Sequence, residues 1–368
     1  MIGAGAVGAS TAWHLAGLGY TVSLIDHNIS ESTNDSLNRN AASPLTGTTA
    51  SLGVLMGYVH RRSSGRAWRL RQRSMGLWPE WIAALTSEEN PLRLERPLVQ
   101  LAGSEAEAER MRKLVRQRPH LGLEEIPSDS IQGLRRCWPC HPWGGLLSHG
   151  DGWVDPLKFQ QNLRSALKAP GRWVDQIEAD VEQLERTCAT KGCLWQVHLT
   201  KGSRLLVDVV VLCNALGSEP LLKSLGHNRP MKPVLGQALE LQLAADGRDW
   251  QGWPAVLVSQ GINMIPTGQD RLLIGASLEP GDHPDPESIE TMSHLSGNAP
   301  EWLMQAKIIN HWHGLRARPE DRPAPLLEVL EPGLVLATAH YRNGVLLAPA
   351  SAEWVAATLK QSRELTCS

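Results

Sequence analysis

The chain opens with a run of small and apolar residues, and its first 25 residues contain no lysine, arginine, aspartate or glutamate. Within this run Ala12, Leu15 and Ala16 recur at helical spacing, and a glycine-rich interruption follows at residues 17–19. Residues 21–25 are then mostly apolar and lead directly into an aspartate. This pattern predicts a helix followed by a short strand.

The uncharged start is not typical of a signal peptide or a membrane span. A signal peptide needs a cationic beginning and an unbroken apolar core, whereas five glycines and His14 interrupt this stretch. No later window reaches the roughly 18 apolar residues of a spanning helix, and the best run, residues 205–212, contains Asp208. We therefore expect a soluble, cytoplasmic protein.

A second helical pattern follows residues 27–49, which are rich in Ser, Asn and Thr and are predicted to form a long loop. One face of this helix is apolar and the other is basic. The apolar face carries Leu70, Ser74, Leu77, Trp81 and Leu85, and the basic side carries Arg61, Arg62, Arg66, Arg69, Arg71 and Arg73. Such a basic stripe can bind RNA or phosphate, but we favour a solvated or internally paired face.

Strand and helix patterns alternate along the rest of the chain. We predict strands at 98–101, 195–200, 204–212, 234–241 and 272–276, and helices at 104–117, from Pro156 and from Ser351. Asp155 has the residue type and position of an N-cap, with Pro156 at the first helical position. Residues 204–212 are nearly all apolar, as expected of a buried parallel strand.

Composition narrows the classes of protein to consider. The chain has 368 residues, a formal net charge of −2 and 42% hydrophobic residues. Its length predicts about two domains, and its apolar content excludes a disordered or collagenous chain. The near-neutral charge excludes nucleic-acid binding by bulk electrostatics. The six cysteines suit a reducing compartment. For Cys137 and Cys140, which lie in a Pro- and Gly-rich loop, we favour ordinary thiols over a redox or zinc site.

Candidate chemistry begins with residues 3–8, which read G-x-G-x-x-G. In the dinucleotide fingerprint the glycines permit a tight turn, a close approach of the backbone to a pyrophosphate and close helix–strand packing. Asp26 lies near the expected offset of about 20 residues, where a carboxylate accepts from a ribose hydroxyl. It would repel a 2′-phosphate, and His27 offers no strong clamp for one, so NADP is disfavoured. Only two residues precede Gly3, so either the true start lies upstream or part of the core is missing.

The order of the motifs resembles the FAD-dependent D-amino-acid oxidase superfamily, and its glycine oxidase branch most closely, over nearly the whole chain. Two motifs are individually specific: Trp312–Arg316 matches W-x-G-l-R, and His340–Pro349 matches G-h-x-R-N-G-i-l-l-a-P. The other matching segments are Gly3–Gly8, Thr48–Leu55, Gly152–Pro156, Val210–Gly217, Pro233–Gln237, Ile265–Thr267 and Leu272–Ser277.

The resemblance implies an α/β fold with two parts. The first is a Rossmann-like FAD-binding domain whose N-terminal strand is truncated, and the second is an α+β substrate domain with a mostly antiparallel sheet. The implied boundaries are 1–88, 148–222 and 314–368 for the FAD-binding domain, and 89–147 and 223–313 for the substrate domain.

The resemblance also implies which residues hold FAD. The binding is expected to be noncovalent, because no cysteine falls within residues 316–321, where the sarcosine-oxidase branch carries its flavin-linking residue. The implied cofactor residues are Gly3, Gly5, Ala6, Val7, Gly8, Asp26, His27, Thr48, Thr49, Ala50, Ser51, Gly53, Val54, Leu55, Val181, Asn214, Ala215, Gly217, Arg316, Arg342, Asn343, Gly344, Val345 and Leu346.

Three residues are implied to act on the substrate. Arg316 would hold the substrate carboxylate through its planar fork, and Arg342 would lie by the flavin and share that carboxylate or a cofactor oxygen. Asn263 stands where glycine oxidase has a tyrosine, and Gly261 stands where a larger polar residue is usual. A larger substrate, a weaker carboxylate site and a changed reaction therefore all stay open.

The implied reaction is oxidation of the Cα–N bond of glycine, sarcosine or a small D-amino acid to an imine, with oxygen as acceptor. In the glycine oxidase branch the imine can feed thiamine biosynthesis. The alternatives are a flavin dehydrogenase that uses a quinone, a tRNA-modification-type amine oxidase and a flavin-binding homologue without activity. An NAD-dependent dehydrogenase would explain residues 3–26 but not the C-terminal motifs. We expect no metal and no nucleic-acid partner, and a homo-oligomer is compatible with the sequence.

Overall fold

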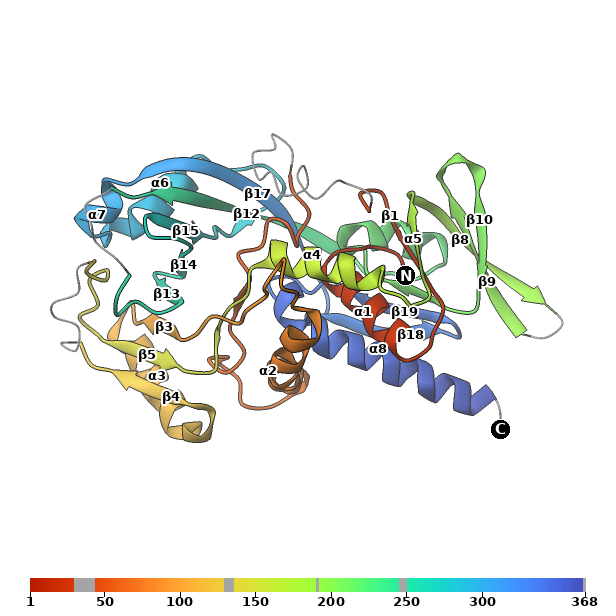
Figure 1. Ribbon diagram of the computed structural model, residues 1–368, viewed down its shortest axis with the longest axis horizontal. Coiled ribbons are helices and arrows are strands. Elements are labelled where there is room, and N and C mark those ends of the chain that lie inside the picture. The colour runs from red at the N-terminus through yellow and green to blue at the C-terminus, as the bar shows by residue number, and fades with distance from the viewer. Residues whose placement is uncertain (30–43, 129–135, 190–191, 245–249, 367–368) are drawn as a thin grey trace.

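The computed structural model describes residues 1–29, 44–128, 136–189, 192–244 and 250–366. Residues 30–43 of the predicted long loop thus lie outside the described part. The molecule is elongated, with a helix-covered parallel sheet towards one end and a second, larger sheet at the other (Figure 1). Both chain termini lie in the half that contains the parallel sheet. In the described residues, no helix combines the length and the apolarity needed to cross a membrane.

The central parallel sheet is built around the segment before Gly3. On one side β1 (Val22–Asp26) pairs in parallel with β7 (Val174–Glu178). On the other side β11 (Val210–Leu212) pairs in parallel with β19 (Leu334–Thr338), and β18 (Leu326–Glu331) adds an antiparallel edge. Ile2 forms parallel bridges to both Ile25 and Leu212, so it joins the two halves of the sheet.

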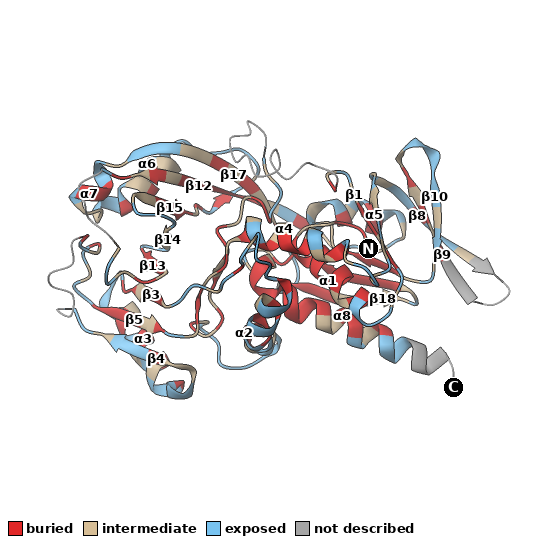
Figure 2. Ribbon diagram, viewed as in Figure 1, coloured by how far each residue is buried: buried red, intermediate tan, exposed pale blue. Residues whose placement is uncertain are grey.

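The parallel sheet has different covers on its two faces. One face packs against four helices, α1 (Ala6–Gly17), α2 (Arg66–Leu85), α4 (Pro156–Leu167) and α8 (Gly344–Thr366), which share one apolar core (Figure 2). A second core lies on the other face. It includes side chains of the antiparallel meander β8 (Val181–Ala189), β9 (Gly192–Leu199) and β10 (Arg204–Val207), and of α5 (Ser218–Ser224). This three-layer arrangement confirms the predicted α/β class.

Several predicted elements are confirmed with their caps. Strand β3 (Leu98–Leu101) is present, and α3 (Glu105–Gln117) begins after Ser104, whose side chain accepts from the amide of Glu107. The carboxylate of Asp155 accepts from the first free amides of α4. In α2 the predicted apolar face is buried, apart from Leu70, which is only partly covered.

The prediction of one buried strand over residues 204–212 is wrong. The run is divided between β10, which is antiparallel to β9, and β11, which lies in the parallel sheet. Leu206 is 66% exposed, and Asp208 lies exposed at the break. An apolar run alone does not show whether it forms one strand or two strands in different sheets. The charged Asp208 inside this run was the indication that it is divided.

The last helix begins at Gly344 rather than at the predicted Ser351. Pro349 lies inside it and cannot donate a backbone hydrogen bond. The neighbouring carbonyl of Leu346 instead accepts from Ser74 Oγ at 2.6 Å and from Trp78 Nε1 at 3.1 Å. Ser74 Oγ also accepts from the amide of Ala350, four residues after Leu346, at 3.5 Å. Side chains of α2 therefore bond the turn of α8 that contains the proline.

The second sheet has nine strands and is antiparallel except for one pair. The parallel pair is β3 with β13 (Val256–Ser259). The strand order is β16-β12-β15-β14-β13-β3-β5-β4, with β17 also paired to β12. Their bounds are β4 (Leu123–Ile126), β5 (Gly145–Ser148), β12 (Met231–Gln242), β14 (Ile262–Pro266), β15 (Arg271–Gly275), β16 (Glu279–Pro280) and β17 (Lys307–Pro319). This confirms the mostly antiparallel sheet that the sequence predicted.

Short elements complete the fold. Helices α6 (Glu287–Ser293) and α7 (Glu301–Met304) lie beside the nine-stranded sheet, and β2 (Val54–Leu55) pairs with β6 (Gly152–Trp153). The long strands β12 and β17 run from the nine-stranded sheet towards the parallel sheet (Figure 1). They therefore carry side chains from one sheet to the edge of the other.

Candidate active site

A cavity of about 1000 Å³ extends from the carboxyl ends of the parallel strands to the nine-stranded sheet. Gly5, near the amino end of the chain, and Gly344, near its carboxyl end, line this one cavity. Gln100 and Asn263 of the nine-stranded sheet line it as well. The volume lies at the upper end of the range for small-molecule and cofactor sites.

The glycine loop approaches neighbouring backbone so closely that side chains would not fit. A Cβ atom on Gly3, which has φ +97°, would lie 2.8 Å from Cα of Asn214. A Cβ atom on Gly8 would lie 1.8 Å from the carbonyl oxygen of Gly3. Gly8 does not itself line the cavity, because its role is to let α1 pack onto the loop. Gly3 and Gly5 line it and leave backbone exposed to a ligand.

Asp26 ends β1 at the rim of the cavity with its carboxylate fixed by backbone amides. Oδ2 accepts from the amide of Ala4 at 2.6 Å, and Oδ1 accepts from the amide of Asn28 at 3.0 Å. Each carboxylate oxygen has a second lone pair. Nδ1 of the neighbouring His27 lies 3.5 Å from Oδ1 of Asp180. This geometry suits acceptance from the hydroxyl groups of a ribose.

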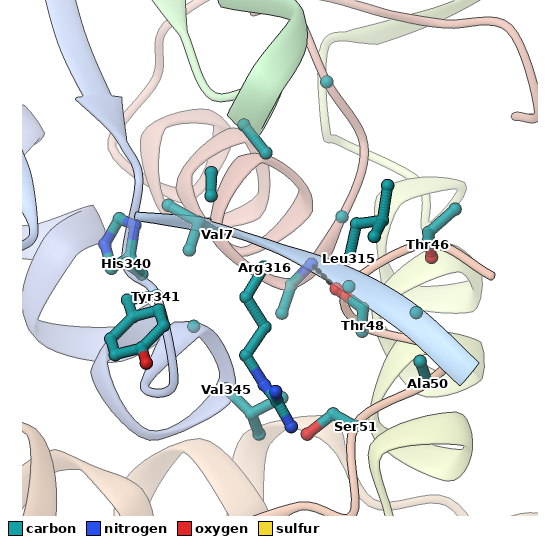
Figure 3. A pocket seen from close by; sticks show the side chains of 18 of the residues that line it. Val7, Thr46, Thr48, Ala50, Ser51, Leu315, Arg316, His340, Tyr341 and Val345 are labelled. Carbon is teal, nitrogen blue, oxygen red and sulfur yellow. Dashed lines mark hydrogen bonds between the residues drawn. The ribbon is translucent and has the colours of Figure 1, made fainter. Parts of the chain in front are cut away.

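Thr48 caps the first helix from a distant segment. Its Oγ1 accepts from the amide of Ala6 at 2.8 Å, and this bond is drawn in Figure 3. Because the oxygen acts as the acceptor there, the hydroxyl proton can be donated to a phosphate oxygen. Together with the positive end of α1, this donor makes the site suitable for a pyrophosphate.

Most of the other predicted cofactor residues line the same cavity. These are Val7, Thr49, Ala50, Ser51, Gly53, Val54, Val181, Ala215 and Gly217. Leu55 does not, because its side chain is fully buried in the core of the parallel sheet. Leu346 does not line it either, since it packs in that core and its carbonyl is bonded by α2.

The carboxyl end of the chain reaches the cavity at the start of α8. Arg342, Asn343, Gly344 and Val345 line it, and the first amides of a helix have no partner within the helix. Nearby, His340 is buried and its Nε2 lies 2.8 Å from Ser351 Oγ. Burial lowers the pKa of His340 to about 3, so this imidazole is neutral at physiological pH.

Arg316 extends from β17 into the cavity, with Tyr341 and Val345 on one side of it and Thr48 and Ser51 on the other (Figure 3). Its Nη1 donates to the carbonyls of Leu235 at 3.0 Å and Ser277 at 3.1 Å. Burial and the charge of Arg342 lower the pKa of Arg316 to about 10, so it remains charged at neutral pH. The rest of its guanidinium fork is available to a carboxylate.

Asn263 lies on β14 opposite Gly275 of β15 and lines the cavity. Its Nδ2 donates to the carbonyl of Gly275 at 2.9 Å, which fixes the side-chain amide. Gly261, two residues earlier, lines the cavity without a side chain. The pair leaves space and a polar oxygen at the two positions where the resemblance implied larger groups in glycine oxidase.

Sequence reasoning missed several basic side chains near Arg316. Arg71 of α2, His60 and Arg61 line the cavity. Arg71 was interpreted as part of a solvated or paired stripe, and that interpretation fits Arg66 and Arg73, which bond to Pro325 and Glu353. The spacing along α2 could have indicated that Arg71 faces inwards. Residue 71 lies four and seven positions before Met75 and Trp78, which are buried in the core, and side chains at these spacings share one face of a helix.

Cys137 and Cys140 are free, exposed and not among the cavity-lining residues. In the part of the chain that the structure describes, no group of three or more His, Cys, Asp or Glu side chains is placed to hold a metal ion.

Comparison with known proteins places this geometry in a family. A family model described as FAD dependent oxidoreductase matches residues 1–358. Glycine oxidase of Pseudomonas putida is 33% identical over 167 residues, which span 44% of this chain and 44% of that relative. The alignment therefore covers less than half of the relative's own length.

Two longer matches extend over nearly the whole chain. Glycine oxidase of Bacillus licheniformis is 23% identical over 363 residues, or 97% of this chain and 91% of that relative. The crystal structure of glycine oxidase from Geobacillus kaustophilus superposes with a TM-score of 0.80 at 21% identity, and covers 98% of this chain and 93% of that one. At this identity the structural match shows the fold alone.

Proposed function

Because this chain belongs to the family of FAD-dependent oxidoreductases, we propose that its large cavity binds FAD noncovalently. The cradle formed by Gly3 and Asn214, the rim carboxylate of Asp26 and the hydroxyl of Thr48 support a site for the adenosine and pyrophosphate. The free amides at the start of α8, at Gly344, support a site for the flavin ring. We also propose that the two-domain boundaries expected from the sequence apply.

We propose that the reaction is oxidation of the Cα–N bond of a small amino acid to an imine. The observation that carries this proposal is Arg316, a buried and charged guanidinium in the same cavity as the residues assigned to the flavin. A planar fork of this kind binds a carboxylate through two parallel hydrogen bonds. The charge of Glu279 acts on Arg316, but no ion pair to Arg316 forms among the described residues, so an anionic ligand is favoured there.

When bound, the flavin supplies the acceptor for two electrons. The residues of the chain then have a positioning role: Arg316 holds the carboxylate, and Oδ1 of Asn263 is placed to accept from the substrate amine. The amine must be unprotonated, and oxidation removes a hydride equivalent from Cα and a proton from nitrogen. No protein base is required, so orientation of the substrate is the main contribution of the site.

The finer assignments rest on the relatives. The similar proteins are named glycine oxidases, so glycine, sarcosine and small D-amino acids are the proposed substrates and oxygen the proposed acceptor. A link to thiamine biosynthesis and a cytoplasmic location stay predictions. RNA recognition by α2 is not proposed, because Arg66 and Arg73 of its basic face are engaged within the chain.

An anaerobic titration tests this function. Purified protein reconstituted with FAD is mixed with glycine, sarcosine, D-alanine and D-proline under nitrogen, and the flavin absorption is recorded. We expect bleaching with at least one of these amines and recovery of the spectrum on admission of air. Bound FAD that is reduced neither by these amines nor by D-aspartate would contradict the proposed reaction and leave the cofactor proposal intact.

A further inference from the structure

Charge is distributed unevenly along the cavity. Its acidic lining residues, Asp26, Asp180 and Glu182, belong to or adjoin β1 and β8, at the end proposed for the nucleotide. The described lining also carries Arg61, Arg71, Arg316 and Arg342, with His60. The charge of Arg342 lowers the pKa of both Arg71 and Arg316, so these three arginines lie close enough to repel one another. One substrate carboxylate accounts for one of these arginines and leaves the charges of the others without an anionic partner among the described residues.

Arg71 is the most informative member of this group. Its Nη1 donates to the carbonyl of Met56 at 3.2 Å, but its buried Nε has no hydrogen-bond partner in the described structure. Burial lowers the pKa of Arg71 to about 10. The negative charge of Asp151 acts against this shift, and the positive charge of Arg342 adds to it. Leaving a buried donor unsatisfied is unfavourable. Arg71 lines the cavity, so a second anion bound there would offset the cost of its buried charge.

Asp151 is the carboxylate whose charge acts on Arg71, but its oxygens are bonded elsewhere. Asp151 is fully buried and accepts hydrogen bonds from the amides of Gly57, Tyr58 and Val59 and from Ser148 Oγ. Its oxygens are therefore committed to the loop that follows β2. Among the described residues, no carboxylate lies within ion-pair distance of Arg71.

The loop that carries His60 and Arg61 is held from outside by two buried charges. Asp151 binds its amides, and Arg118 donates to the carbonyls of Tyr58, His60 and Arg62 while its guanidinium lies 4.0 Å from the ring centre of Trp68. His60 Nε2 is buried without a partner in the described structure. Such a fixed loop presents a preorganised polar surface to a ligand.

We propose that the substrate of this site is an amino acid with a second anionic group, a dicarboxylate, whose second carboxylate is bound by Arg71 with His60 and Arg61. Arg316 keeps the α-carboxylate, so this inference rests on the proposed function. The missing side chain at Gly261 and the short side chain of Asn263 leave room for the longer substrate. The competing role for Arg71 is a contact with the flavin itself.

Matched pairs of substrates test the proposal on the wild-type holoenzyme. The pairs are D-aspartate with D-asparagine, D-glutamate with D-glutamine, and iminodiacetate with sarcosine, so the first two differ in charge but hardly in size. We expect kcat/KM to be at least tenfold higher for the acid in one pair or more. Oxidation of neutral substrates with no preference for any acid would overturn the dicarboxylate proposal while leaving the amine oxidase function standing. No oxidation of any member would instead count against the function itself.

Variants assign the effect to Arg71. Arg71→Met should lower the ratio of kcat/KM for the acid to that for its neutral partner at least tenfold, and Arg71→Lys should lower it less. Arg69→Met on the exposed side of the same helix is the matched control and should leave the ratio unchanged. A binding assay needs no turnover. It compares succinate with succinamate, in which one carboxylate is replaced by a neutral amide, and monitors binding by the change in the flavin absorption spectrum.

The binding measurement also separates the two roles of Arg71. We expect Arg71→Met to weaken succinate at least tenfold more than succinamate. An altered FAD affinity or flavin spectrum, with an unchanged ratio for the two ligands, would overturn the proposal and assign Arg71 to the cofactor. If Arg71→Met does not fold, Arg71→Lys and the wild-type substrate ratios decide the question.

Discussion

A Cβ atom placed on Gly236 would lie 2.1 Å from Nη2 of Arg316 and 2.4 Å from its Cζ. Gly236 belongs to β12, which pairs with β17, the strand that carries Arg316. The guanidinium therefore lies against bare backbone, and its Nη1 bonds the carbonyl of the preceding residue, Leu235. A glycine on one strand thus fixes the position of the proposed carboxylate-binding group on the next.

Gly236→Ala should displace Arg316 and weaken substrate binding. We expect KM for the best amino-acid substrate to rise about tenfold or more, which corresponds to about 1.4 kcal/mol. Steady-state kinetics with saturating FAD measure the change. Gly268→Ala is the control, because its Cβ would make only ordinary 3.6 Å contacts with Arg271. Equal effects of the two substitutions would contradict this account of Gly236.

Removal of the guanidinium itself should be more severe. In Arg316→Met the substrate carboxylate loses its charged partner, and we expect KM to rise by an amount equal to about 2–5 kcal/mol. The FAD content of the purified variant, measured by absorption, serves as the control for an intact fold. An unchanged KM would show that another group, such as Arg342, binds the carboxylate.

The sequence predicted those parts of the site that lie within one short segment better than it predicted where charged side chains gather in the cavity. The glycine loop and Asp26 could be found because turn, phosphate and ribose chemistry restrict residue types within a short segment. Arg71 could not be assigned in this way, since an arginine on an amphipathic helix is normally solvated. Its burial depends on Met56 and on the loop held by Arg118, which are remote in sequence.

The fold shows the same limit. Asp155 was identifiable as a helix cap because capping depends on neighbouring residues. The start of α8 was not, because a proline inside a pattern normally ends a helix, and the bonds from Ser74 and Trp78 to the turn around Pro349 come from the remote helix α2. Such tertiary bonds leave no periodic signal in the sequence.

Two glycine substitutions should have opposite effects on stability. Gly8→Ala would place a methyl group 1.8 Å from the Gly3 carbonyl, and we expect a loss of roughly 1–3 kcal/mol or more with weaker FAD binding. Gly76→Ala meets no atom within 4 Å on the exposed side of α2 and should gain about 0.5–1 kcal/mol. Thermal unfolding monitored by circular dichroism measures both. Unaltered FAD affinity in Gly8→Ala would contradict the proposed packing role.

Acid should destabilise the protein through His340. Burial lowers the pKa of its imidazole from 6.5 to about 3, so between these values the unfolded chain binds a proton that the folded chain does not. Stability therefore falls as the pH is lowered through this range, with a contribution of up to about 1.4 kcal/mol per pH unit. His340→Gln should reduce the slope of unfolding free energy against pH between pH 4 and 6, as measured by urea denaturation.

The pKa of His60 is lowered to about 4, chiefly by burial and then by the charge of Arg71. His60 should therefore account for part of the pH dependence of unfolding free energy that remains in His340→Gln. A slope that is identical in the wild type and in His340→Gln would show that His340 is accessible to protons in the folded state.

We propose that the segments at Gly5 and Gly344, near the two ends of the chain, meet around one FAD molecule. A crystal structure of the protein grown with FAD shows whether they do. We predict the ribose of the adenosine at Asp26, the pyrophosphate between Gly5 and Thr48, and the flavin ring beside Gly344 and Arg316. Crystals in which FAD is absent from this cavity, or bound elsewhere, would contradict the claim.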